Sequence, residues 1–186
     1  MSITRENAVG LLNQYIKNDR MLNHCYATES VMRALAHRLA QEEEKWALAG
    51  LLHDLDVELV NADLTIHGLE TEKILKEKGV DPEIIDAIVM HNETVSNKKR
   101  HTKFQHALAA GETITGLIIA TTMVYPDKKI ASVKPKSVVK RMKEKAFAAS
   151  VSRENIMECE KIGLSLDEFV EICLDAMREI SEKLGL

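Results

Sequence analysis

The sequence predicts an all-α fold, and three observations lead to this prediction. Glycine (8 residues) and proline (3 residues) are scarce in the 186-residue chain, and aromatic residues make up only 4% of it. The dominant residue types, among them Ala, Leu, Glu and Lys, favour helices. Apolar residues recur at steps of three and four, and no segment shows the alternation of a half-buried strand. Because a chain of this length can bury a sizeable core, we expect one helical domain over residues 1–186.

Composition also restricts the classes of function. The formal net charge is −4, which gives no overall attraction to nucleic acid or to an anionic membrane. Cys25, Cys159 and Cys173 form no CxxC pair, so neither a thiolate zinc site nor a disulfide framework is indicated. The chain begins without a signal-peptide pattern and has no apolar run of about 18 residues. These features are typical of a cytoplasmic protein, and we expect neither a membrane nor a nucleic-acid partner.

Three helices are expected in the first 55 residues. Thr4 can cap the first of them. The second, over about 21–40, has an apolar stripe at steps of three and four, and His24 lies on this inward face. The third contains Trp46–Leu52, where every residue is apolar or Gly, so it should be buried on all sides.

Two shorter helices should follow. One runs from about Ile66 to Gly79, because Gly is a good C-cap, and His67 lies at its start. The residues Asp81-Pro82-Glu83 are a strong start signal for the next helix, with Asp as the cap and Pro in the first position. The spacing of this helix directs His91 inward at its end.

A polar loop over residues 92–103 separates these helices from a long one over about 104–125. Glu112 lies in the middle of the apolar stripe of that long helix, which is an unusual place for a lone carboxylate. A basic stretch follows over 126–145, and Pro135 should open a helix that continues toward Ala149.

The C-terminal segment carries two more helix starts. Ser152 begins one helix, and Ser165 with Glu168 forms a capping box for the last one. The last helix can pack internally or against a second copy of the chain, so a homo-oligomer stays open. Its apolar face consists of Phe169, Ile172, Cys173, Met177 and Ile180.

Imidazole and carboxylate groups occupy several positions that should be buried. The buried third helix runs directly into His53 and Asp54, and a buried carboxylate costs several kcal/mol or more unless it is paired or coordinates a metal. Singly, each group has an ordinary explanation: His24 as a core histidine, His91 at a helix C-terminus, Glu112 paired with a base. Together they are better explained by one site for Mn, Fe, Co, Ni or Zn, which a helical bundle can hold.

These residues resemble a known family, the HD-domain metal-dependent phosphohydrolases. The resemblance rests on the order of His24, then His53-Asp54, then the distal acid Glu112. It extends over most of the chain and is closest to a bacterial subgroup of predicted HD-superfamily hydrolases. The segments that carry it are NHCYATESVMRALA, LAGLLHDLD, HGLE, HNE, TGLIIA and PKSVVKRMKEKAFAA.

The resemblance implies a fold and a ligand set. It implies a single HD-type helical domain with a core over about 20–125 and helices over 126–186 packed on it. It makes His24, His53 and Asp54 metal ligands and places Glu112 where the family normally has Asp. Binuclear members have two more histidines between the His-Asp pair and the distal acid, and these places are occupied by His67 and His91. One or two divalent metals are therefore implied.

The expected function is hydrolysis of a nucleotide or another small phosphate ester by metal-activated water. Asp54, Asp56 and Glu58 are the candidate catalytic acids. For the substrate phosphate we expect Lys136, Lys140 and Arg141, with residues 98–100 as a second basic patch, although a solvated helix face explains these charges equally well. The alternative is a catalytically impaired HD-fold protein that binds metal or nucleotide in a regulatory role, and a helical interaction module without metal is a third class.

Overall fold

The computed structural model describes residues 3–186. Over this range the chain forms eleven α-helices, two short 3-10 helices and no β-strand, so the predicted all-α fold is confirmed. In the same range, none of the helices combines the length and the apolar character that crossing a membrane requires. The elements are α1 (Arg5–Tyr15), α2 (Asp19–Arg38), α3 (Glu43–Leu52), α4 (Leu69–Glu77), α5 (Pro82–His91), α6 (Glu93–Ser96), α7 (Lys103–Met123), η1 (Ile130–Ser132), α8 (Pro135–Met142), α9 (Arg153–Met157), η2 (Glu158–Ile162), α10 (Leu166–Glu179) and α11 (Ser181–Leu184).

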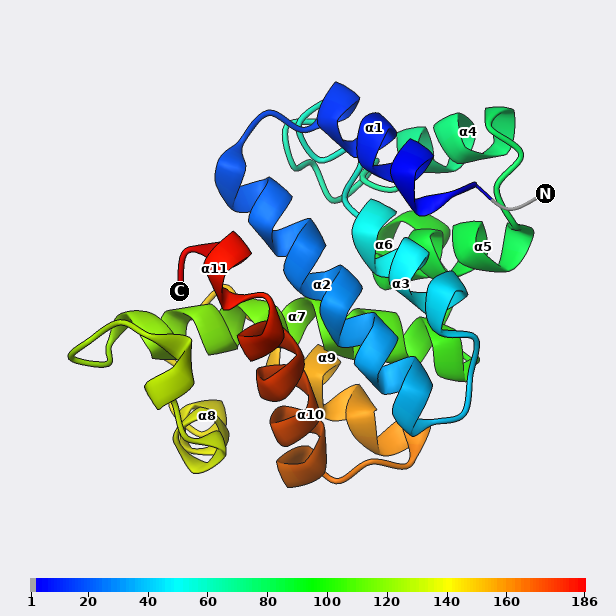
Figure 1. The fold of residues 1–186 in the computed structure, drawn as a ribbon. Coiled ribbons are helices and arrows are strands. Elements are labelled where there is room, and N and C mark those ends of the chain that lie inside the picture. Colours follow the sequence, from blue (N-terminus) through cyan, green and yellow to red (C-terminus); the bar gives the residue numbers. More distant parts are fainter. Residues whose placement is uncertain (1–2) are drawn as a thin grey trace.

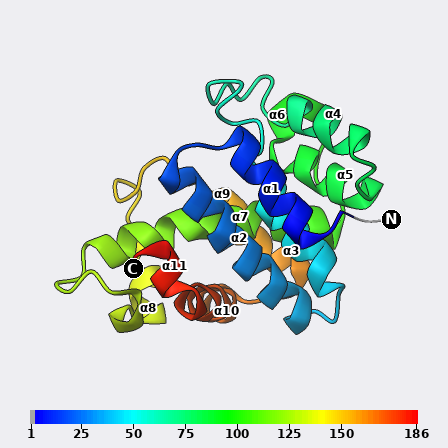
Figure 2. The same cartoon turned by 45° about the horizontal axis from the view of Figure 1, so that its top comes forward.

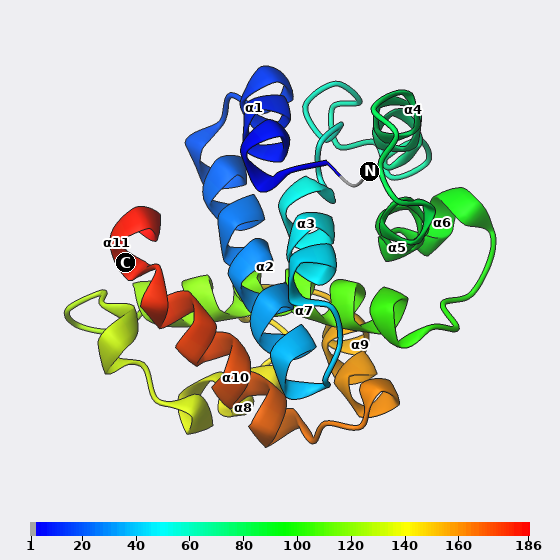
Figure 3. The ribbon, with the colours of Figure 1, turned by 45° about the vertical axis from the view of Figure 1, so that its right-hand side comes forward.

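Helix α7 is the centre of the arrangement and packs against helices from both halves of the chain. Figure 1 shows α7 running behind α2, with α10 beside α2 on the same side of it. In Figure 3, α2, α3 and α10 lie next to one another across α7. Helices α4 to α6 gather near one end of α7, whereas α8 lies near the other end (Figure 2). The middle of α7 is therefore enclosed by neighbouring helices.

The helix starts follow capping side chains that the sequence predicts. Thr4, Asp81 and Ser165 each accept a hydrogen bond from a backbone N–H in the first turn of α1, α5 and α10. Ser152 does the same for α9. These bonds satisfy N–H groups that have no partner inside the helix, which is why local sequence is enough to locate the starts.

Three boundaries differ from the prediction. The helix expected from residue 66 begins at Leu69, because the chain first makes a series of turns over residues 53–68. The helix expected to reach Ala149 ends at Met142, because the guanidinium of Arg153 binds the backbone carbonyls of turns between residues 141 and 151. The loop expected over 92–103 contains the short helix α6.

The core confirms the prediction for the third helix, because every residue of Trp46–Leu52 is buried in α3. The ring of Trp46 stacks on Phe104 of α7 with the ring centroids 5.1 Å apart. At the other end of the chain, Phe169 and Met177 of α10 are fully buried where α10 packs against α2, α7 and α8. Of the predicted apolar face of α10, Phe169, Cys173 and Met177 are buried within the chain, and Ile172 and Ile180 are partly buried.

Close contact between α2 and α3 leads to a stability prediction for Gly50→Ala. A Cβ at residue 50 would lie 2.6 Å from the backbone oxygen of Thr28, so the two helices would have to move apart. We expect the free energy of unfolding to fall by about 1–3 kcal/mol, as overpacking usually costs. Equilibrium urea denaturation measures the change.

The matched control is Gly10→Ala in α1, where a Cβ would meet nothing within 4 Å. This exposed helical site should gain about 0.5–1 kcal/mol, because Ala loses less backbone entropy than Gly on folding. If Gly50→Ala proves as stable as the unchanged protein, the tight approach of α2 and α3 does not limit stability.

Candidate metal centre

Six imidazole and carboxylate side chains converge beside the middle of α7. They come from five separate segments of the chain, and all are buried or nearly so. The ligand atoms fall into two groups. Within each group the atoms lie within 4.8 Å of one another, which is close enough to bind one metal ion. The residues are His24 on α2, His53 and Asp54 after α3, His67 before α4, His91 at the end of α5, and Glu112 on α7.

Two of the four histidine rings are oriented by backbone carbonyls. The Nδ1 atom of His53 lies 2.8 Å from the backbone oxygen of Gly50, and Nδ1 of His91 lies 2.5 Å from that of Ile88. Because a carbonyl oxygen only accepts, Nδ1 of each ring must carry the proton. In the neutral form of both rings, Nε2 is therefore the nitrogen with the free lone pair.

The other two rings are oriented by side chains. Nδ1 of His67 donates to the carboxylate of Asp56 at 2.8 Å. Nδ1 of His24 lies 3.0 Å from the hydroxyl of Thr115, which itself donates to the backbone oxygen of Glu112 and so must accept from His24. Such partners fix ring orientation in metal-ligating histidines. All four Nε2 atoms consequently face the centre of the cluster.

The separations between these Nε2 atoms fit metal ligation. Nε2 of His24 lies 3.1 Å from Nε2 of His53, and the same atoms of His67 and His91 are 3.0 Å apart. Two nitrogens bound to one metal, each by a bond of about 2.1 Å at an angle of about 90–110°, lie about 3.0–3.4 Å from each other. Two lone pairs facing each other repel unless a proton or a cation lies between them, so the donor set fits a divalent metal.

The carboxylate of Asp54 lies between the two pairs of imidazoles. Its Oδ1 atom is 3.1 Å from Nε2 of His67 and 3.6 Å from Nε2 of His91. Its Oδ2 atom is 3.5 Å from Nε2 of His24 and 3.4 Å from that of His53. One carboxylate can therefore contact two neighbouring metal positions.

Glu112 completes the group formed with His24 and His53. Its Oε2 atom lies 4.0 Å from Nε2 of His24. Its other oxygen accepts a hydrogen bond from the hydroxyl of Thr113, and burial raises the pKa of the Glu112 carboxyl.

Charges within the cluster differ from one group to the next. Burial lowers the pKa of His24 to about 4, which leaves this ring neutral at pH 7. Burial alone would also lower the pKa of His67, but the carboxylates of Asp54 and Asp56 outweigh it and raise it to about 10. A metal at His67 must therefore displace a proton, which is the usual link between metal binding and proton release.

Two of the three candidate catalytic acids lie outside the ligand groups. Asp56 is fully buried behind His67, and its Oδ2 atom accepts backbone N–H groups of Gly68 and Thr71 at the start of α4. Glu58 accepts the backbone N–H groups of residues 17 and 18 before α2. Only Asp54 of these three acids stands among the described ligand atoms.

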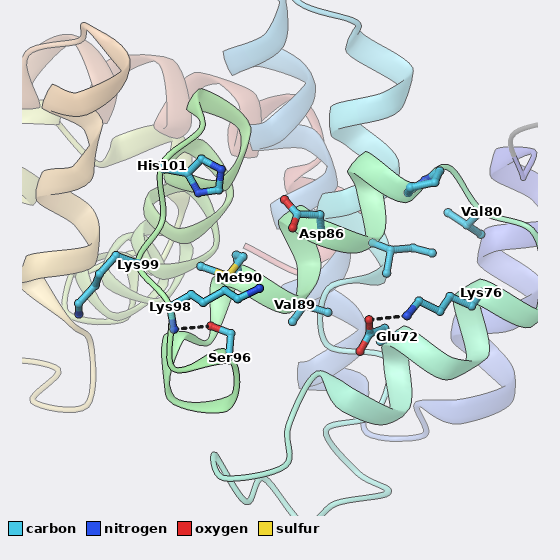
Figure 4. Close-up of a pocket in the computed structure, with 12 residues that line it drawn as sticks. Glu72, Lys76, Val80, Asp86, Val89, Met90, Ser96, Lys98, Lys99 and His101 are labelled. Atoms are coloured by element: carbon cyan, nitrogen blue, oxygen red, sulfur yellow. Dashed lines mark hydrogen bonds and ion pairs between the residues drawn. The ribbon is translucent and has the colours of Figure 1, made fainter.

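A hollow of about 450 Å³ opens onto the cluster. Asp54, His67, His91 and Glu112 line it, together with residues that include Val57, Leu64, Arg100 and Asn155. A second hollow of similar volume is bordered by residues of α4, α5 and the segment before α7 (Figure 4), and none of the ligand residues described above is among those that line it.

The predicted phosphate-binding residues lie elsewhere. Lys140 and Arg141 line a separate hollow of about 260 Å³ near the end of α7, and Lys136 is on the same helix, α8. Lys98 and Lys99 border the second hollow in Figure 4 rather than the one at the cluster. The basic stretch is thus kept from the cluster because α8 packs beside the far end of α7.

The fold and the cluster define an all-α protein with a buried histidine and aspartate centre that can hold a divalent metal. The family model of the HD domain matches residues 21–123, and the chain belongs to this family. Comparison with curated proteins and with solved structures gave no match. Membership of the HD family indicates a metal-dependent hydrolase.

Several residues around the cluster are not evident from the sequence. The hydrogen bond from His67 to Asp56 depends on the turn that brings Asp56 behind this ring. The position of Asp56 two residues after Asp54 predicted only a candidate catalytic acid. Thr115 shares the stripe of Glu112 on α7, which is the signal that could have identified it. Arg100 and Glu158 are 58 residues apart, and no local pattern pairs them.

The contacts of Asp56 lead to a prediction for Asp56→Asn in the metal-free protein. Burial alone would raise the pKa of this carboxyl, but hydrogen bonds from His67 and from backbone N–H groups outweigh burial and lower it. Replacing a carboxylate that accepts several buried N–H groups should cost about 1–3 kcal/mol at pH 7. Urea denaturation between pH 7 and pH 3 measures the difference.

The sign of the pH dependence follows from the lowered pKa. A carboxylate of this kind stabilises the fold above its unfolded pKa of about 3.9, and this contribution is lost as the pH falls through the folded pKa. The two proteins should therefore differ most above about pH 4 and converge below it. A difference that stays constant over the whole range would contradict this account. Asp167→Asn, at an exposed carboxylate in the first turn of α10, is the control.

Proposed function

We propose that the protein is a metal-dependent phosphohydrolase whose centre holds two divalent transition-metal ions. One observation carries this proposal: two pairs of imidazoles lie on either side of one buried carboxylate. Within each pair the two Nε2 atoms are 3.0 or 3.1 Å apart. In the proposal, His24, His53 and Glu112 hold one ion and His67 with His91 hold the other, while Asp54 contacts both. Nitrogen and oxygen ligands of this kind suit Mn, Fe, Co, Ni or Zn.

Different residues of the chain have different roles in the proposed hydrolysis. When bound, the metals supply positive charge for a phosphoryl oxygen and lower the pKa of a coordinated water. Asp54 keeps both positions at a fixed separation, and Asp56 holds the ring of His67 through Nδ1. The apolar side chains of Val57 and Leu64 border the hollow and can contact the leaving group.

The lining of the hollow favours a substrate of low charge. Arg100 is the one arginine among the described lining residues, and it directs all of its N–H groups to protein oxygens. No lysine is among the residues that border this hollow. The charge of a triphosphate would lack side-chain partners, whereas a phosphomonoester can be neutralised by the metals themselves. We therefore propose a small phosphomonoester as the substrate, such as a nucleoside monophosphate.

Asp54→Asn tests the metal centre. The amide cannot bridge two cations, so we expect loss of metal from protein purified without chelator or His-tag. The fall in kcat/KM for a phosphomonoester should exceed the roughly 100-fold typical of residues that only support a ligand. Elemental analysis and a phosphatase assay measure both effects, and Asp63→Asn is the matched surface control.

The same measurements distinguish the proposed hydrolase from the competing hypothesis. Full metal content and full turnover in Asp54→Asn would overturn the proposed centre. Metal or nucleotide binding without turnover in the unchanged protein would favour the catalytically impaired, regulatory HD-fold protein instead.

The charge of the lining predicts a preference between substrates. With the metal-loaded protein, kcat/KM for para-nitrophenyl phosphate should exceed that for a nucleoside triphosphate by at least about tenfold, or ~1.4 kcal/mol of transition-state stabilisation. The triple change Lys136→Ala, Lys140→Ala and Arg141→Ala should leave both values unaltered, because α8 lies away from the hollow. A preference for the triphosphate, or a loss of turnover in the triple variant, would show that the basic helix takes part after all.

A further inference from the structure

Arg100 lies on the segment between α6 and α7, and its side chain is only 5% exposed. All of its guanidinium nitrogens are engaged. Nε and Nη2 donate to the carboxylate of Glu158, and Nη2 also donates to the amide oxygen of Asn155 at 3.1 Å. Nη1 donates to the backbone oxygens of Met90 and His91, each at 3.0 Å. Arg100 therefore connects several segments beside the hollow and has no N–H group left to donate to a ligand.

The two carbonyls that Arg100 binds belong to the last turn of α5. The final carbonyl groups of a helix have no partner inside it, and a cation at this end also interacts favourably with the helix dipole. His91 is the last residue of α5, and its ring is held by Nδ1 against the backbone oxygen of Ile88 in the same turn. If this turn frayed, both the backbone and the ring of His91 would lose their position.

Arg100 is held in turn by a segment beyond the HD match. Asn155 belongs to α9 and Glu158 to η2, whereas the match ends at residue 123. Glu158 also accepts from Nδ1 of His106 on α7 at 2.7 Å, so its carboxylate is fixed from two sides. The neighbouring Lys98, Lys99 and His101 are among the residues that line the hollow of Figure 4, while Arg100 lines the one at the cluster. The ion pair between Arg100 and Glu158 thus joins the C-terminal segment to α5.

We propose that Arg100 is a positioning residue for the metal position formed by Asp54, His67 and His91, and that the segment 153–162 keeps it in place. Arg100 touches no ligand atom of the cluster and acts through the last turn of α5. Occupancy of this one position then depends on residues outside the HD match. The inference rests on the proposed metal centre and goes beyond it by making the two metal positions unequal.

The test is a calorimetric titration of chelator-treated protein with Mn²⁺. The unchanged protein should show two binding events, and His91→Ala identifies the event that belongs to the position with His67. In Arg100→Lys the charge stays, but one ammonium cannot reach two carbonyls, Glu158 and Asn155 at once. We expect the Kd of that event to rise about 10- to 100-fold, as for other residues that support a ligand, and the other event to stay within about twofold.

Arg178→Lys is the matched control. Arg178 on α10 is also a partly buried arginine that donates to backbone carbonyls, those of Ile130 and Val133, but it lies outside the segment 153–162. Both binding events should persist in this variant. If Arg100→Lys does not fold, Glu158→Gln takes its place, because it leaves Arg100 without its counter-charge and should weaken the same event.

The outcomes separate this inference from the proposed function. Two unaltered events in folded Arg100→Lys, or in Glu158→Gln, would overturn the inference alone. Equal weakening of both events, repeated in Arg178→Lys, would also overturn it, because the effect would then be general. No uptake of Mn²⁺ by the unchanged protein, together with no phosphatase activity, would overturn the proposed function and the inference with it.

Discussion

The buried carboxylate of Asp54 is the constraint on which the rest of the structure depends. A charge this deep in a helical core is costly unless other groups compensate it on every side. In the metal-free protein His67, whose pKa is raised to about 10, donates to Oδ1 of Asp54. Two imidazoles face each oxygen of this carboxylate, so bound metal ions would compensate the charge at both. The approach of α2 to α3 at Gly50 serves the same end, because it brings the rings of His24 and His53 to 5.0 Å between centroids.

Features that depend on neighbours in sequence are the ones that the sequence predicts well. The caps at Thr4, Asp81 and Ser165, the buried helix α3 and the inward side of His24 all follow from local pattern. The end of α8 at Met142 does not, because it depends on a guanidinium that arrives from residue 153. The same holds for Arg100, which sequence composition groups with Lys98 and Lys99 although Arg100 lines the hollow at the cluster and the two lysines line the other one.

The basic stretch shows why composition is a poor guide to a binding surface. A run of lysines and arginines shows that charge is present but not where in the fold it lies. Here the length of α7 decides how far these charges are from the cluster. Glu112 lies at the middle of α7, and the eleven residues from it to Met123 rise about 16 Å. Because α8 packs at that far end, its charges are about half the length of α7 away from the cluster. In the proposed hydrolase, the positive charge at the substrate phosphate would come from the metals, in keeping with a substrate of low charge.

The glutamate at position 112 can be understood from the packing of α7 on α2. A Cβ at Gly111 would lie 3.2 Å from the side chains of Val31 and Met32, so α7 already approaches α2 closely at this level and has little room to move nearer. The carboxylate of Glu112 then reaches to within 4.0 Å of Nε2 of His24. An aspartate would begin one bond, about 1.5 Å, farther back. The longer side chain of Glu112 therefore compensates for the position of α7. This favours Glu112 as a functional ligand over the alternative in which the change from Asp marks a loss of activity.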